Sequence, residues 1–170
     1  MSPEPEKIRL GVSSCLLGHA VRYDGCHKLN AVVVDLLGPS VEWVPVCPEV
    51  ELGLGIPRPP IQLTGSTRAP RLLVTTTDED LTERMQRWAA RRIDELRALG
   101  LHGYVLKSRS PSCGLDDVPV QGAERPGRGA FAAVLVEALP GLAIEDEVRL
   151  ADPVVRARFL ERARAAARAR

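Results

Sequence analysis

Short apolar runs alternate with polar, glycine- and proline-rich stretches through much of this chain. The apolar runs at residues 8–14, 41–46 and 103–107 each predict a buried strand, and a shorter run at 72–75 predicts another. The first three runs end abruptly in polar, turn-forming residues. The groups with chemical potential therefore follow the ends of predicted strands.

A helical period is clearest from Leu81 to Leu99, where apolar residues recur every three or four positions. Residues 77–80 provide caps and acids for its first turn, and Gly100 provides the stop. Further helices are predicted over 31–37 after an Asn30 cap, over 130–139, and from Asp152-Pro153 onward.

This order of elements predicts an α/β fold. A long helix followed by the strand at 103–107 forms a crossover, so parallel pairing is expected. We predict a Rossmann-like, open and mostly parallel sheet flanked by helices, in one domain over residues 7–170 after a disordered tail at 1–6. The Gly- and Pro-rich segment 53–60 is expected to be an ordered loop near a site, and 118–129 a polar loop.

Composition excludes several classes of function. A net charge of +1 and 4% aromatic residues give no general signal for nucleic acid or an anionic membrane. No apolar run approaches the roughly 20 residues that span a bilayer, and the first residues lack a signal-peptide pattern. We therefore expect a cytoplasmic protein whose four cysteines are thiols or metal ligands, although two disulfides are an alternative.

Three of the cysteines stand just beyond predicted strands: Cys15, Cys47 and Cys113. Since the carboxyl ends of parallel strands meet at one edge of a sheet, these residues can meet despite their separation in sequence. No pair has the CxxC spacing of a zinc ribbon or a ferredoxin, so spacing alone is a weak signal. A shared site and three separate core cysteines both remain open from the residues alone.

Several segments in the same order resemble the thiouracil desulfidase (TudS) family. They are residues 14–18, 21–25, 46–50, 57–59 and 107–114. Residues 49–55 and 144–150 are similar to the branch of that family in which this domain is often fused to a second one. The likeness covers roughly residues 7–160, and five ordered motifs are far more specific than any one of them.

The resemblance implies a 4Fe-4S cluster held by Cys15, Cys47 and Cys113, with one open iron. The implied activity is hydrolytic removal of sulfur from a thiolated pyrimidine, without redox change, at a C=S bond activated by that iron. The candidate substrates are 2- or 4-thiouracil, thiouridine or its nucleotide, and thiolated tRNA. The acceptor of the sulfide is unassigned, no membrane is implied, and a monomer or a homodimer is expected.

Eight further residues are predicted to act in this site. Glu49 is the expected general acid/base, or otherwise a surface carboxylate. Ser110 and Ser112 are expected to hydrogen-bond the substrate or the cluster, or otherwise to cap their turn. The remaining candidates are assigned to substrate binding: Ser14, Arg22, Asp24, Lys107 and Arg109. Arg22, Lys107 and Arg109 are alternatively expected to offset the negative charge of the thiolates and the cluster, or to lie at the surface, and Asp24 to hold its loop.

Cys26 stands where relatives usually carry glycine, and as a fourth ligand it would close the open iron. We do not expect that role, because the other three cysteines already match the pattern. Two rival functions remain. One is a cysteine hydrolase that uses Cys47 with Glu49 and His27, and the other is a non-catalytic RNA-binding module that uses the arginine-rich end.

Overall fold

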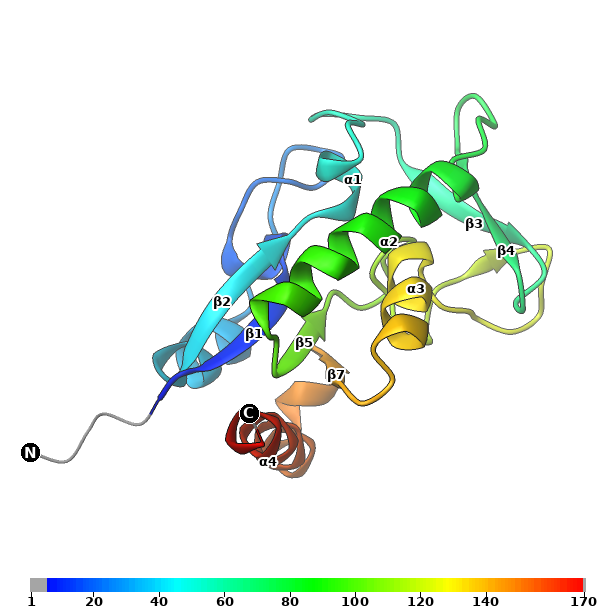
Figure 1. The fold of residues 1–170 in the computed structure, drawn as a ribbon. Coiled ribbons are helices and arrows are strands. Elements are labelled where there is room, and N and C mark those ends of the chain that lie inside the picture. Colours follow the sequence, from blue (N-terminus) through cyan, green and yellow to red (C-terminus); the bar gives the residue numbers. More distant parts are fainter. Residues whose placement is uncertain (1–5, 170) are drawn as a thin grey trace, which may run out of the picture.

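Four parallel strands form the central sheet of the computed structural model, which describes residues 6–169 (Figure 1). Their order is β2-β1-β5-β7. The strands are β1 (Ile8–Ser13), β2 (Val41–Val46), β5 (Gly103–Leu106) and β7 (Ala143–Asp146). The predicted α/β fold with a mostly parallel sheet is therefore confirmed, although β7 was not predicted.

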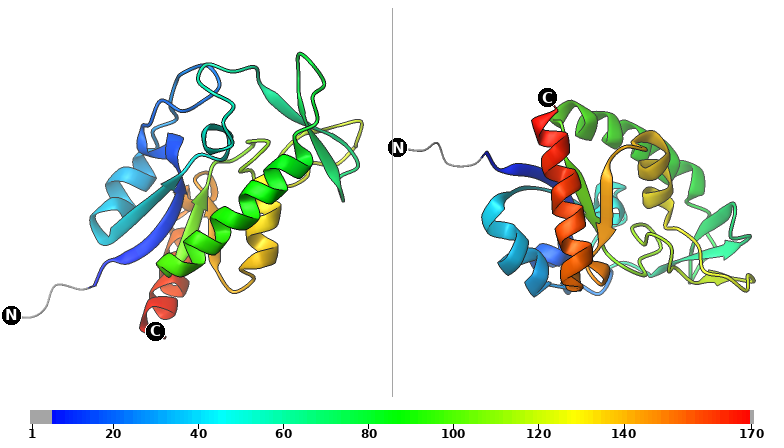
Figure 2. Two further views of the ribbon diagram at one scale, coloured as in Figure 1. Left: turned by 45° about the horizontal axis from the view of Figure 1, so that its top comes forward. Right: turned by 90° about the horizontal axis from the view of Figure 1, so that it is seen from below.

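Helices cover both faces of this sheet (Figures 1 and 2). One core contains Tyr104 and Leu106 with the apolar faces of α2 (Thr82–Leu99) and α3 (Ala130–Ala138). The opposite core contains Val105 with the apolar face of α4 (Pro153–Arg168). The alternation along β5 follows from the two-residue period of a strand, so burial on both faces requires an apolar residue at every position.

One glycine makes room for an aromatic ring in the first of these cores. A Cβ at Gly11 in β1 would lie 2.3 Å from Cδ2 of Tyr104 on β5. Tyr104 in turn packs against Phe131 of α3, with the ring centroids 5.9 Å apart. The missing side chain lets α3 dock above the sheet, and α3 begins beside the site described below.

The predicted helix signals are found in the structure. Asp80 accepts a hydrogen bond from the backbone N–H of Thr82, and Gly100 ends α2 in the left-handed conformation. Asp152 caps α4 by accepting from the N–H of Val154. The helix predicted over 31–37 is a π-helix, Val32–Leu37, and the Asn30 side chain accepts from Val33 in its first turn.

A second, three-stranded sheet corrects the prediction. It contains β3 (Ile61–Gly65), β4 (Pro70–Val74) and β6 (Val120–Gln121), in the order β4-β3-β6. The strand predicted over 72–75 is found as part of β4, whereas β3 was not predicted and β6 lies in the segment assigned to a loop. The remaining elements are α1 (Pro48–Glu51) and the 3-10 turns Ser14–Leu17, Gly38–Ser40 and Arg149–Ala151.

The segment 53–60 has no helix or strand, as predicted, and part of it reaches the site. Of the tail predicted over residues 1–6, all but Glu6 lies outside the described residues. Within residues 6–169 no helix has both the length and the apolar character needed to cross a membrane.

Candidate metal and substrate site

Three strands deliver the cysteines to one edge of the central sheet. Ser13 at the end of β1 is paired with Val46 at the end of β2, and β5 runs parallel beside β1. Cys15 therefore lies two residues beyond β1, and Cys47 one residue beyond β2. Cys113 lies on the turn that follows β5. The carboxyl edge of an open parallel sheet is the usual place for a ligand site.

Local structure fixes two of these cysteines. The carbonyl of Cys15 in its 3-10 turn accepts from the N–H groups of Gly18 and Lys28. Cys47 is the N-cap of α1, and its N–H donates to the Glu51 carboxylate at 3.0 Å. Hydrogen bonds thus hold the backbone at both cysteines before any ligand binds.

The turn that carries Cys113 is held by its own serine and by α3. The Ser110 hydroxyl oxygen accepts from the N–H groups of Ser112 and Cys113, at 3.3 and 3.1 Å. The first N–H groups of α3 donate to this turn, because the Ser112 carbonyl accepts from Phe131 and Ala132. These helix donors have no partner inside their own helix, so the turn satisfies them.

Gly129, just before α3, lets the helix approach the turn this closely. A Cβ at Gly129 would lie 2.5 Å from the carbonyl carbon of Ser112 and 2.8 Å from the nitrogen of Cys113. Any side chain at this position would displace the backbone that carries Cys113.

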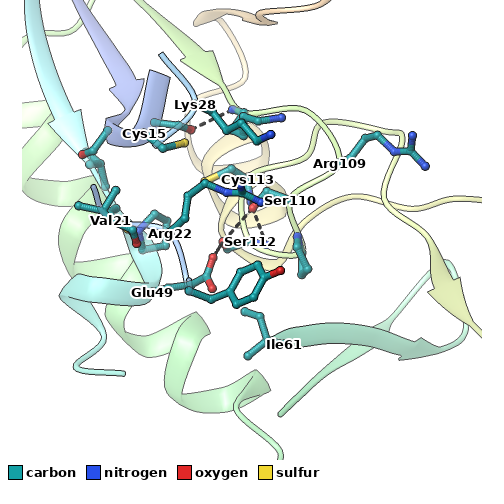
Figure 3. Close-up of a pocket in the computed structure, with 18 of the residues that line it drawn as sticks. Cys15, Val21, Arg22, Lys28, Glu49, Ile61, Arg109, Ser110, Ser112 and Cys113 are labelled. Atoms are coloured by element: carbon teal, nitrogen blue, oxygen red, sulfur yellow. Dashed lines mark hydrogen bonds between the residues drawn. The ribbon is translucent and has the colours of Figure 1, made fainter. Parts of the chain in front are cut away.

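All three cysteines line one cavity of about 250 Å³ (Figure 3). The predicted site residues that also line it are Ser14, Arg22, Glu49, Lys107, Arg109, Ser110 and Ser112. Asp24 and Cys26 do not line it. Figure 3 shows the Arg109 side chain pointing away from the cysteines.

Burial suppresses ionisation of the three thiols. It raises the pKa of Cys15 to about 11, while the charge of Lys107 acts in the opposite direction. The pKa of Cys47 and that of Cys113 are also raised, mainly by burial. The buried Ser13 side chain has a smaller, opposite effect on the pKa of Cys113. A metal bound to the three thiols would stabilise their deprotonated form inside the buried cavity, since a coordinated thiol loses its proton.

Glu49 faces the cavity with both carboxylate oxygens engaged. Its Oε2 accepts from the Ser112 hydroxyl at 3.0 Å, and its Oε1 accepts from Nε of Arg58 at 3.3 Å. Ser112 Oγ also lies 3.2 Å from Ser110 Oγ, so the two serines and the glutamate form one hydrogen-bonded chain. Glu49 lies in the short helix α1.

Arg58 was not predicted as a site residue. Its side chain is only 2% exposed, and its guanidinium donates to the carbonyls of Gly55 and Val21 as well as to Glu49. Its own N–H donates to the carbonyl of Tyr23. The sequence signal for a site role of Arg58 was its place in a Pro-Arg-Pro segment, where a charged side chain is not expected to be part of the apolar core.

The loop 18–29 forms another side of the cavity through Val21, Arg22, Tyr23 and Lys28. The Arg22 guanidinium lies 3.8 Å from the Asp24 carboxylate and 5.7 Å from the centre of the Tyr23 ring. Asp24 accepts from the N–H of Cys26, and this bond is the main cause of a lowered Asp24 pKa. Asp24 therefore stabilises the loop, which is the alternative role expected for it from the sequence.

The cavity fits a cluster better than a single ion. Among residues 6–169 no three His, Cys, Asp or Glu side chains are arranged to hold one metal ion. The three thiols instead surround a cavity, and a cubane cluster needs ligands spread over several iron atoms. The buried Tyr104 hydroxyl has no hydrogen-bond partner in the described part of the chain. Soft sulfur donors favour iron-sulfur chemistry over magnesium or calcium.

Comparisons with known proteins point to the same chemistry. The profile of the 2-thiouracil desulfurase family matches residues 10–147. Uncharacterized protein YbbK of Bacillus subtilis (strain 168) is 33% identical over 135 residues, which cover 75% of this chain and 89% of that protein. The solved structure of the [4Fe-4S]-dependent thiouracil desulfidase TudS matches with a TM-score of 0.69 and 32% identity, over 91% of this chain and 98% of that one.

Proposed function

Because the chain belongs to the 2-thiouracil desulfurase family, we propose that it is an iron-sulfur-dependent desulfidase acting on thiolated pyrimidines. The observation that carries the proposal is the convergence of Cys15, Cys47 and Cys113 on one cavity that Glu49 also lines. The family and the structural match to a 4Fe-4S-dependent enzyme support the cofactor and the substrate class.

Cys15, Cys47 and Cys113 would hold the cluster as its three protein ligands. When bound, a cluster with three protein ligands supplies one iron that is free to act as a Lewis acid on the sulfur of a C=S bond. Cys26 is exposed and lies outside the cavity wall, so it is not proposed as a fourth ligand.

Glu49 is the proposed general base and acid. It accepts a proton from the water that attacks the thiocarbonyl carbon, and later returns it to the departing sulfur. The water oxygen becomes the new carbonyl oxygen, and the sulfur leaves as hydrogen sulfide with both water protons. No oxidant or reductant is consumed. Ser112, 3.0 Å from the Glu49 carboxylate, keeps that carboxylate facing the cavity.

The loop 18–29 and the neighbouring strand ends are proposed to bind the base. Tyr23 lines the cavity with a 40% exposed side chain, so its ring offers a face on which a planar pyrimidine can stack. Ser14 and Arg22 line the same cavity and provide a hydroxyl and a cation for the polar edge of the substrate or for a phosphate. Thiouracil, thiouridine, its nucleotide and thiolated tRNA remain the candidate substrates, in the cytoplasm.

The rival hydrolase lacks an activating base among the described residues. Burial raises the pKa of the Cys47 thiol, so little nucleophilic thiolate is present. His27 is exposed, does not line the cavity, and uses Nδ1 to accept from the N–H of Leu29. The arginine-rich end of α4 lies on the other face of the sheet from α2 and gives the RNA-binding alternative no further support.

Anaerobic reconstitution with iron and sulfide tests the proposal. We expect the wild-type protein to bind iron and labile sulfide and to release sulfide from 2- or 4-thiouracil. Cys15→Ser, Cys47→Ser and Cys113→Ser are each expected to abolish both properties, while Cys26→Ser, the matched control, keeps both. A loaded wild-type protein that releases no sulfide from any thiolated pyrimidine, base or nucleotide, would overturn the function.

A further inference from the structure

Lys107 lines the cavity, yet its ammonium has no donor left for a substrate. Nζ lies 3.0 Å from Oε1 of Glu147, 3.1 Å from Oγ of Ser108 and 2.9 Å from the Ser108 carbonyl oxygen. An ammonium carries three N–H donors, and three acceptors are in place. The side chain is thus held at the cavity wall and is not free to reach a substrate.

Glu147 is the residue that holds it. This side chain, 7% exposed, follows β7 and also accepts from the N–H and the hydroxyl of Ser108, at 2.8 and 2.5 Å. The Glu147 carboxylate therefore links the end of β7 to the end of β5, because it accepts hydrogen bonds from three donors that follow β5. A buried ion pair of this kind costs desolvation, and so it is weak evidence for a purely stabilising role.

The position of the pair indicates a different purpose. Lys107 follows β5 and lines the same cavity as Cys15, Cys47 and Cys113. Its backbone adds a second link, because the N–H of Lys107 donates at 2.9 Å to Oγ of Ser13, two residues before Cys15. Lys107 is thus tied to the strand end that leads to Cys15, at the wall of the cavity that all three proposed ligands line.

We propose that Lys107 is a fixed counter-charge for the thiolate-bound cluster and that Glu147 is the positioning residue that immobilises it. The inference rests on the proposed function. Three thiolates and inorganic sulfide concentrate negative charge in a buried cavity, and a nearby cation lowers the free energy of that charge. Holding the cation through Glu147 keeps its charge fixed at the cavity wall, with all three N–H donors engaged.

The test compares Lys107→Met and Lys107→Arg with the wild type, all reconstituted with the cluster. We expect Lys107→Met to shift the reduction potential of the cluster to a more negative value, because an added electron loses a nearby positive charge. Loss of iron to a chelator should become about tenfold faster. Lys107→Arg keeps the charge and should resemble the wild type. Lys7→Met, the same change at an exposed position before β1, is the control and should alter neither quantity.

The role of Glu147 is tested by a double-mutant cycle. Glu147→Gln should speed iron loss several-fold, and this effect should disappear in the Lys107→Met background, because Glu147 acts through Lys107. An effect of full size in that background would overturn the positioning role. The counter-charge proposal would be overturned if the wild type is loaded and active and Lys107→Met has the same reduction potential and the same rate of iron loss. A wild type that takes up no cluster would instead overturn the proposed function.

Discussion

Two sides of the cavity differ in how firmly they are built. The strand-end wall, residues 107–114, is largely buried, and hydrogen bonds from Glu147 and from the start of α3 hold it. The loop wall, residues 18–29, has no helix or strand beyond single turns and is mostly exposed. The difference indicates a division of labour: a pre-organised wall suits a rigid inorganic cofactor, and an adaptable wall suits a substrate that must enter and leave.

Glu49 accepts from Ser112 of the strand-end wall and from Arg58, which in turn donates to Val21 of the loop wall. As the proposed general base it should give the largest effect when replaced. Glu49→Gln keeps the size of the side chain and removes the proton acceptor. We expect kcat to fall by about 10²–10⁴-fold, while iron and sulfide content stay at the wild-type level. Steady-state assays on the loaded protein measure this. Glu83→Gln, an exposed change in the first turn of α2, serves as the control. A Glu49→Gln enzyme with wild-type kcat would remove Glu49 from the reaction.

Thiol reactivity in the cluster-free protein sharpens the comparison further. Cys26 belongs to the loop 18–29 but does not line the cavity, and it is exposed, while burial raises the pKa of Cys15 to about 11. At pH 8 iodoacetamide should modify Cys26 first and Cys15 on the order of 100-fold more slowly, because the thiolate is the reactive form. Mass spectrometry of timed samples gives both rates. Equal rates at the two positions would contradict the burial of Cys15.

The sign of the pH effect follows from the same shift. The unfolded chain releases the Cys15 proton near pH 9, before the folded chain does so near pH 11. Its contribution to the stability of the cluster-free protein is therefore complete below about pH 9 and is lost between about pH 9 and 11. The alkylation rate at Cys15 should rise over that same interval.

The loop wall should yield the smallest effect. Tyr23→Leu removes the aromatic face, and we expect KM for thiouracil to rise about tenfold with kcat changed by less than about threefold, since stacking on an aromatic ring stabilises the bound base by about 1–3 kcal/mol. Tyr23→Phe keeps the ring and should retain the wild-type KM. If kcat falls instead and KM is unchanged, Tyr23 acts in the reaction and not in binding.

Sequence patterns predicted the central fold because its signals are local. The strands around Val12, Val44 and Val105 are continuous apolar runs, and α2 has a clear helical period and stop. Strand β7 was missed because it contains only four residues, two of them acidic. The second sheet was missed because β6 has two residues and is defined by pairing with β3, a contact that no local pattern encodes.

The candidate site divides in the same way. The positions of the cysteines were predictable because each follows the end of a strand, and parallel topology alone brings those strand ends to one edge of the sheet. The partners of each charged side chain were not predictable, because they come from distant segments. Lys107 finds Glu147 forty positions away, and Glu49 finds Ser112 across 63 positions. The ion pair of Lys107 with Glu147 was therefore not predicted, and of the two site roles expected for Lys107 we propose the offset of cluster charge.

Gly129 has a consequence for anyone who redesigns this enzyme. A map of the active centre drawn from side chains alone would omit it, although its missing methyl group is what allows α3 to touch the backbone of Ser112 and Cys113. A library that randomises the mostly exposed segment 121–126 for solubility or a new linker should stop short of this buried position. Even alanine there would alter the proposed metal site, through the main chain that carries Cys113.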